Sequence, residues 1–79
     1  MARVMLFGPL RDVAGWRERD LPAASITALK ALLAAEDSAL GLALYGKGVQ
    51  VAVDQAIVRG DLALSANAEV AFLPPMSGG

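Results

Sequence analysis

The chain contains no cysteine and no histidine. These absences exclude disulfides, thiolate nucleophiles, iron–sulfur ligation and zinc sites that are built on Cys or His ligands. The chain also lacks the side chain that most often acts as a general base at neutral pH. We therefore predict no metal site, and we expect any chemistry to use a group other than these side chains.

Excess charge and long apolar runs are missing as well. Seven Lys and Arg residues against eight Asp and Glu residues give a net charge of -1, and no basic cluster could follow a phosphate backbone. The first apolar run, Val4 to Phe7, is too short for a signal sequence, and no segment approaches the length of a membrane span. We expect a cytoplasmic protein that contacts neither nucleic acid nor membrane.

The composition is nevertheless rich in apolar residues. Hydrophobic residues make up 56% of the 79 residues, although 16 of them are alanine, and only 19% are charged. A domain of this size buries only about 60% of the surface that its unfolded chain exposes. We therefore predict a single domain over residues 1–79, with some apolar surface left for a partner.

The last six residues read Pro74-Pro75-Met76-Ser77-Gly78-Gly79. Proline fixes its own φ and restricts the residue before it to an extended conformation, so this tail, residues 74–79, is predicted to leave the domain directed outward. Glycine has no side chain that would obstruct a narrow channel. The carboxylate of Gly79 is thus the candidate reactive group, and the alternative is a frayed end or a cloning remnant.

The first half of the chain predicts two strands and a helix. Residues 3–7 form a strand that is apolar on both faces, and residues 16–21 form an edge strand paired with it as a hairpin. Residues 8–15 between them are expected to be a loop anchored by Leu10 and Val13. Ser25 is a suitable N-cap for a helix that runs to about Glu36, because apolar residues then recur at helical spacing.

The second half predicts three more strands. Residues 37–48 stay ambiguous, with room for a short helical turn, and residues 49–53 alternate as a strand that is closed by a turn at Asp54-Gln55. Residues 57–58 form a short return strand. Residues 60–67 are an irregular turn held down by Leu62 and Leu64, and residues 69–73 form the last strand.

These elements predict an α+β fold, a mixed sheet with one main helix packed on one face. The helix crosses that face so that the last strand pairs with the first, which leaves the other face uncovered. Alternation then assigns Leu6 and Phe72 to the covered face, and Phe7 and Leu73 to the uncovered one, beside the root of the tail.

The chain resembles the ubiquitin-like β-grasp sulfur carriers, most closely the MoaD family, the small subunit of molybdopterin synthase. The likeness covers nearly the whole sequence: Val4-Met5-Leu6-Phe7, residues 10–15, Ser25-Ile26, Val53-Asp54-Gln55 and residues 69–79. Its specific part is a Val-Ala-Phe strand followed by Pro-Pro, two further residues and Gly-Gly. A bare Gly-Gly end is also found in thiamin-type carriers and in protein modifiers, which normally lack the proline pair.

This resemblance implies a function. Gly79 would be adenylated by an ATP-using, MoeB-type enzyme and would receive sulfur from a donor such as a cysteine desulfurase or a rhodanese-like protein. The thiocarboxylate would enter the large synthase subunit, of the MoaE type, and pass sulfur to cyclic pyranopterin monophosphate to build the molybdopterin dithiolene. The carrier would bind no cofactor, and the catalytic residues would lie on the large subunit.

The resemblance also implies partner-binding residues. Carried over by matching motif, they are Phe7, Arg11, Ile57 and Leu73, together with Pro74, Pro75, Met76 and Ser77 of the tail. Gly78 belongs with Gly79 to the reactive end. The alternatives are core packing for the three large apolar residues and a merely solvated charge for Arg11. Two departures concern turns: Asn67 would supply a left-handed conformation in place of the family's glycine, and Asp54 replaces an asparagine.

Three rival functions share these residues. A ubiquitin-like modifier would use the same adenylated terminus to form isopeptide bonds with lysines, and a thiamin-type carrier would use the same sulfur chemistry. A structural domain without a reactive terminus is the third. Its test is simple, because the carboxylate argument collapses if the gene encodes residues beyond Gly79.

Overall fold

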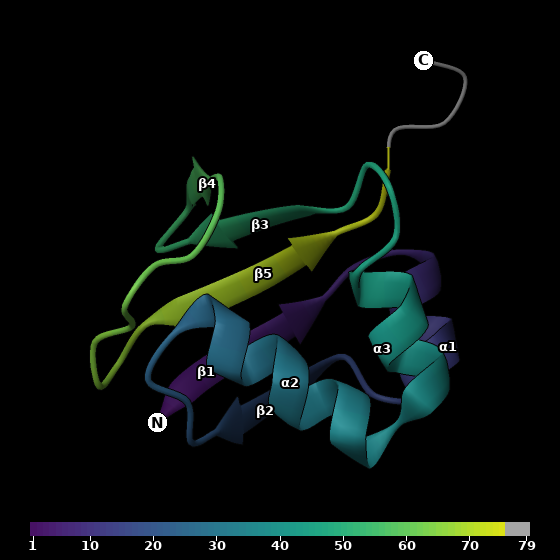
Figure 1. Cartoon of the computed structure of the whole chain (residues 1–79), viewed down its shortest axis with the longest axis horizontal. Coiled ribbons are helices and arrows are strands. Elements are labelled where there is room, and N and C mark those ends of the chain that lie inside the picture. Colours follow the sequence, from purple (N-terminus) through teal and green to yellow (C-terminus); the bar gives the residue numbers. More distant parts are fainter. Residues whose placement is uncertain (76–79) are drawn as a thin grey trace.

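A computed structural model describes residues 1–75 of the chain. It contains five strands and three helices (Figure 1). In chain order they are β1 (Ala2–Leu6), α1 (Pro9–Ala14), β2 (Glu18–Leu21), α2 (Ile26–Glu36), α3 (Ser38–Leu44), β3 (Gln50–Val53), β4 (Ala56–Val58) and β5 (Glu69–Leu73).

The strands form one mixed sheet in the order β2-β1-β5-β3-β4. The central pair, β1 and β5, is parallel, with Leu6 opposite Phe72, whereas the other neighbours are antiparallel. The predicted pairing of the last strand with the first is therefore confirmed, and so is β2 as an edge strand. The α+β, ubiquitin-like β-grasp fold is correct.

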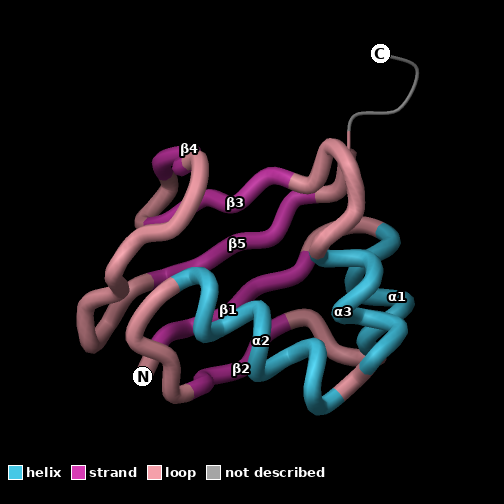
Figure 2. Tube along the Cα trace, viewed as in Figure 1, coloured by secondary structure: helices cyan, strands magenta, loops and turns pink. Residues whose placement is uncertain are grey.

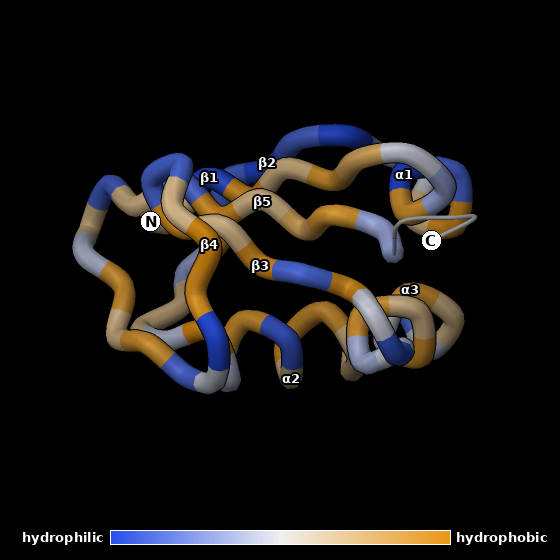
Figure 3. Tube along the Cα trace, turned by 90° about the horizontal axis from the view of Figure 1, so that it is seen from above, coloured by the Kyte–Doolittle hydropathy of each residue, from blue (hydrophilic) through white to orange (hydrophobic). Residues whose placement is uncertain are grey.

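The core lies between the sheet and the helices α2 and α3. Seen from above, these helices lie on one side of the strands (Figure 3). The strands turn Val4, Leu6, Val70 and Phe72 toward them, and all four are almost fully buried. Among residues 1–75 no helix covers the opposite side, so the predicted uncovered face is present.

Helix α2 begins as predicted at its N-cap, Ser25. The Ser25 hydroxyl accepts from the Ala28 amide at 3.1 Å, the Asp61 carboxylate accepts from the Thr27 amide at 2.8 Å, and the Ile26 amide donates to a carbonyl of the β4–β5 loop at 3.0 Å. These three partners satisfy the amides that the first turn of a helix leaves free. The long β4–β5 loop, drawn in pink in Figure 2, is thus tied to α2.

Two segments between the predicted elements contain further helices. Residues 8–15 were expected to be a loop but contain α1, which corrects the sequence prediction, whereas α3 in residues 37–48 agrees with the short helical turn for which the sequence left room. Pro9 at the first helical position and Gly15 as a left-handed C-cap explain α1. The Asp37 carboxylate accepts from the Leu40 amide at 3.1 Å and so caps α3.

Three local expectations are wrong. Val13 and Leu62 were expected to be apolar anchors, yet both are exposed, whereas the other two predicted anchors, Leu10 and Leu64, do pack in or against the core. Backbone hydrogen bonds also hold the β4–β5 loop. Strand β2 begins at Glu18 and not at residue 16. Asn67 does not adopt a positive φ; among residues 1–75 the non-glycine residues that do are Asp54 and Gln55, at the β3–β4 turn, as in hairpin turns of type I′.

Candidate functional site

The root of the tail is an extension of the sheet's central pair. Strand β5 ends at Leu73 and continues into the half-buried Pro74 and the exposed Pro75. The amide of Phe7 donates to the carbonyl of Phe72 at 3.3 Å, which ties the end of β5 to the end of β1. The tail therefore starts where the two central strands of the sheet are joined.

An apolar cavity of about 450 Å³ adjoins the two prolines. It lies between α1 and α3 and the chain that leads into β3. Its lining includes Pro9, Leu10, Val13, Ala43, Lys47, Val49, Pro74 and Pro75. The sequence reasoning did not place α1, α3 and Lys47 beside the tail. The signals available were Pro9 and Gly15, which mark α1.

The uncovered side of the sheet carries a set of apolar side chains. We call it the outer apolar face, and it comprises Met5, Phe7, Ala52, Ile57, Ala71 and Leu73. The registers place Ala52 opposite both Ala71 and Ile57, and Met5 opposite Ala71, so these residues share a face. Extending the β1–β5 register by one residue sets Phe7 beside Leu73. Phe7 is 43% exposed and Ile57 50%, whereas Leu73 is half-buried.

These exposures decide between the alternatives for the predicted contact residues. Phe7 and Ile57 do not belong to the core, and Leu73 is half-buried but lies outside the core cluster. The structure thus brings Phe7 and Leu73 together at the root of the tail and places Ile57 farther along the same face, on β4. Their contact with a partner stays a prediction.

Arg11 projects from α1, close to the same end of the molecule. Its side chain is exposed, and its backbone amide donates to the carbonyl of Gly8 at 3.1 Å. Within residues 1–75 it forms no ion pair. By contrast, Arg3 of β1 pairs with Glu18 at 3.3 Å and with Asp20 at 3.4 Å, both on β2. Arg11 is available to an acidic group of a partner.

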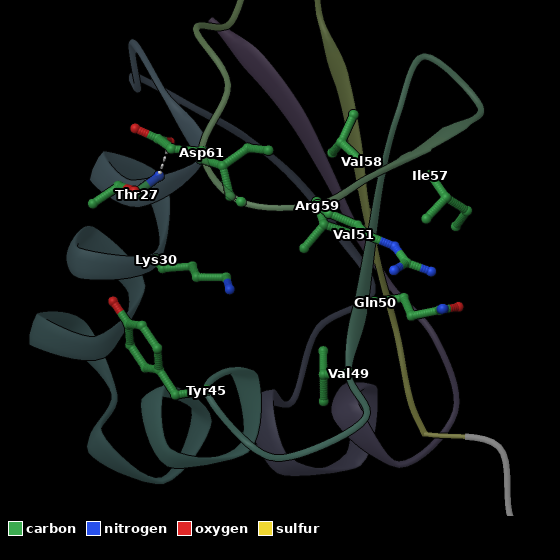
Figure 4. A pocket seen from close by; sticks show the side chains of 12 residues that line it. Thr27, Lys30, Tyr45, Val49, Gln50, Val51, Ile57, Val58, Arg59 and Asp61 are labelled. Carbon is green, nitrogen blue, oxygen red and sulfur yellow. Dashed lines mark hydrogen bonds between the residues drawn. The ribbon is translucent and has the colours of Figure 1, made fainter.

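A second cavity, of about 410 Å³, lies away from the tail, between α2 and the strands β3 and β4 (Figure 4). Lys30 stacks on the ring of Tyr45, with its Nζ 5.3 Å from the ring centre. At the upper rim, the hydrogen bond from the Thr27 amide holds the pKa of the Asp61 carboxyl below its ordinary value. These groups have structural partners in the fold itself.

Four predicted site residues, Met76, Ser77, Gly78 and Gly79, lie outside the described residues. In the part that the structure does describe, no three acidic side chains gather as a metal site would require. No helix of residues 1–75 is both long and apolar enough to cross a membrane.

The ThiS family model matches residues 4–79, which is nearly the whole chain. The chain belongs to the ThiS family. It is also 33% identical over 81 aligned residues, which span all of both chains, to the molybdopterin synthase sulfur carrier subunit of Escherichia coli. The resemblance to MoaD-type sulfur carriers is therefore confirmed.

Solved structures of similar proteins share this fold. SAMP1 from Haloferax volcanii is 26% identical, with a TM-score of 0.80 over 99% of this chain and 98% of the other. The small archaeal modifier protein 1 of Methanosarcina acetivorans is 24% identical, with a TM-score of 0.86 over 99% and 95%. Subunit 1 of the molybdopterin-converting factor of Helicobacter pylori, solved in complex with subunit 2, aligns at 23% identity with a TM-score of 0.72 over 99% and 97%. As a ThiS-family member the chain is a sulfur carrier of the ThiS and MoaD type.

Proposed function

We propose that this ThiS-family protein is the sulfur-donating small subunit of a molybdopterin synthase. The observation that carries the proposal is the end-to-end similarity to the E. coli sulfur carrier subunit of that enzyme. The sequence of the tail, with its proline pair and two glycines, supports it.

The reactive group in this proposal is the carboxylate of Gly79. A carboxylate is a poor electrophile at neutral pH, so an activating enzyme first joins it to the α-phosphate of ATP and releases pyrophosphate. A sulfide then attacks the acyl carbon, AMP leaves, and the thiocarboxylate remains. If the donor is a persulfide, attack gives an acyl disulfide, and a second donor thiol cleaves it while forming a disulfide.

The delivery step uses the thiocarboxylate as a nucleophile. Its sulfur bonds to a side-chain carbon of cyclic pyranopterin monophosphate, and a carbon–oxygen bond at that carbon breaks, its oxygen leaving as water or with the phosphate group. Water then cleaves the bond between sulfur and the acyl carbon, which restores the Gly79 carboxylate. One carrier gives one sulfur, so a dithiolene needs two rounds. The carrier supplies no base and no metal in these steps, which agrees with its lack of histidine and cysteine.

The partner in the delivery step is the large synthase subunit. Phe7 and Leu73 of the outer apolar face lie at the root of the tail, and α1, which carries Arg11, lines the same cavity as Pro74 and Pro75, so a partner that covers these groups also receives the tail. The solved complex of subunits 1 and 2 of the H. pylori molybdopterin-converting factor supports a partner of this kind.

The alternative is a ubiquitin-like modifier or a thiamin-type carrier. The archaeal modifier proteins among the similar structures favour the first, and the family name favours the second. Both use an adenylated C-terminus, so adenylation does not separate them from the proposal. Formation of dithiolene distinguishes a synthase subunit from both alternatives.

The test is reconstitution of dithiolene formation from cyclic pyranopterin monophosphate with purified large subunit and activating system. Deleting Gly79 should abolish product and leave the thermal midpoint nearly unchanged, because a terminal residue beyond the last strand adds little to the fold. Replacing Gly78 with Val keeps the carboxylate but should reduce delivery, because a β-branched side chain restricts the backbone and would obstruct a channel fitted to glycine.

Intact mass of the protein from its own cells provides the independent check. A terminus at Gly79 with one oxygen replaced by sulfur is the expected result. Product from the Gly79 deletion would refute the proposal. Isopeptide conjugates without dithiolene formation would favour the modifier.

A further inference from the structure

Two glycines from different loops touch the two prolines at the root of the tail. Gly8 precedes α1, and a Cβ placed on it would lie 3.1 Å from Cγ of Pro74. Gly48 lies between α3 and β3, and a Cβ placed on it would lie 2.8 Å from Cβ of Pro75. Contacts between real Cβ atoms and other heavy atoms are essentially never shorter than 3.0 Å, so a side chain at Gly48 would displace Pro75.

Backbone conformation alone does not explain these glycines. Gly8, Gly15, Gly48 and Gly60 all have a positive φ, of 57°, 82°, 87° and 78°. Glycine adopts such angles with little strain, and that requirement is sufficient at Gly15 and Gly60, where an added Cβ meets nothing within 4 Å. At Gly8 and Gly48 there is a second requirement, which is room for the proline rings.

We propose that Gly8 and Gly48 are positioning residues for sulfur transfer, because they set the direction in which the tail leaves Pro74 and Pro75. This inference rests on the proposed function and extends it. The prolines are stiff and follow directly on β5, so the space that the two glycines leave beside them limits where the proline rings lie relative to the sheet. Neither glycine touches the reacting atoms.

The length of the tail makes this direction important. Four residues follow Pro75, and an extended chain of four residues spans at most about 14 Å. A turn of about 10° at Pro75 therefore moves the far end of an extended tail by roughly 2 Å. Misplacing a reacting group by about 1 Å can cost on the order of a hundredfold in rate. A carrier that has docked correctly would then deliver its sulfur slowly.

The decisive variant is Gly48→Ala, with Gly60→Ala as its matched control. Both place alanine at a similar positive φ, so both should lower the thermal midpoint by a few degrees. Only Gly48→Ala collides with Pro75. With each carrier supplied as its preformed thiocarboxylate, Gly48→Ala should lower kcat for dithiolene formation by about tenfold or more, with KM little changed because the outer apolar face is intact.

A second background shows whether the effect passes through Pro75. Pro75→Gly removes the atom with which the added Cβ collides. This variant should itself lower kcat, since the tail loses its fixed direction, and the thermal midpoint should stay nearly unchanged. Adding Gly48→Ala to it should then lower kcat no further.

Three results would overturn the inference: equal kcat for Gly48→Ala and Gly60→Ala, an undiminished effect of Gly48→Ala in the Pro75→Gly background, or full activity of Pro75→Gly. The last one applies even if Gly48→Ala does not fold. The wild-type protein separates failure of this inference from failure of the proposed function. If the wild-type thiocarboxylate gives no product, the proposed function itself is refuted. A nuclear Overhauser contact between Gly48 and Pro75 is expected in either case, and its absence would refute the contact.

Discussion

At the scale of single residues, two phenylalanines on the paired central strands have opposite environments. Phe72 on β5 is fully buried beneath the helices, whereas Phe7, which follows β1, is 43% exposed on the other side of the sheet. The difference comes from strand alternation, since Phe72 lies opposite Leu6 and Phe7 is the next residue. The same truncation should therefore have different effects at the two positions.

Phe7→Ala is expected to weaken binding of the large synthase subunit by about 2 kcal/mol or more, because aromatic residues near the centre of an interface contribute most. Its effect on the free energy of unfolding should be small. Titration calorimetry measures the first quantity and urea denaturation the second. Unchanged affinity combined with a large loss of stability would assign Phe7 to the core.

Phe72→Ala and Arg11→Ala are the controls. The first should cost about 3–5 kcal/mol of folding stability, since it empties a buried aromatic site. The second removes an exposed charge at the rim, so it should weaken binding much less than Phe7→Ala, and its effect should shrink as salt is added.

At the scale of elements, α2 depends on a loop that is distant in sequence. The Asp61 carboxylate accepts a hydrogen bond from the Thr27 amide in the first turn of α2. That hydrogen bond lowers the pKa of Asp61 below its ordinary value of 3.8. A carboxyl group whose pKa is lower in the folded state stabilises the fold above its unfolded pKa, and the contribution is lost as the pH falls below that value.

Asp61→Ala is therefore expected to lower the thermal midpoint at pH 7. The difference in thermal midpoint between this variant and the wild type should stay constant down to about pH 4. Below that pH it should shrink, because the wild-type Asp61 becomes protonated and loses the contribution that the variant lacks at every pH. Asp61→Asn keeps an oxygen that can accept the hydrogen bond from the Thr27 amide, so it should lower the thermal midpoint less than Asp61→Ala does. Melting curves between pH 2.5 and 7 measure this, and a difference that grows on acidification would contradict it.

The packing of α2 against α3 depends on a buried glycine. A Cβ on Gly41 would lie 2.6 Å from the Cβ of Ala34 and 2.8 Å from its Cα. Gly41→Ala is expected to cost about 1–3 kcal/mol of folding stability by overpacking. Ala34→Gly in the same chain should recover part of this loss, which urea denaturation of the two single variants and the double variant would show. Strictly additive effects would mean that the two residues do not interact.

The elements also differ in how far the sequence predicted them. Strands β1 and β5 and helix α2 were predicted because their apolar spacing reports burial directly. Helices α1 and α3 have six and seven residues, too few for such a pattern, although Pro9 and Gly15 marked the ends of α1. The outward direction of Phe7 and Leu73 followed from alternation. The contacts of Gly8 and Gly48 with the prolines did not, because they join loops that are far apart in sequence.

At the scale of the whole molecule, the sheet has helices on one side and the outer apolar face on the other. Phe7 and Ile57 of this face are exposed, Met5, Ala71 and Leu73 are half-buried, and Ala52 is buried. A stable protein interface usually buries about 800 Å² on each partner. A second copy could cover this small face but little else, whereas the large synthase subunit would also enclose the tail.

The isolated protein is therefore expected to self-associate only weakly, and Ile57→Glu should separate binding from folding. Ile57 is 50% exposed on β4, so the substitution should change the thermal midpoint little, while a charge buried without a partner should weaken the complex with the large subunit by tenfold or more. Sedimentation equilibrium measures the self-association and calorimetry the complex. Leu29→Ala, at a fully buried position of α2, should instead cost about 2–5 kcal/mol of folding stability. A tight homodimer that Ile57→Glu dissociates would show that this face binds a second copy, and the large subunit would then have to displace that copy to reach the tail.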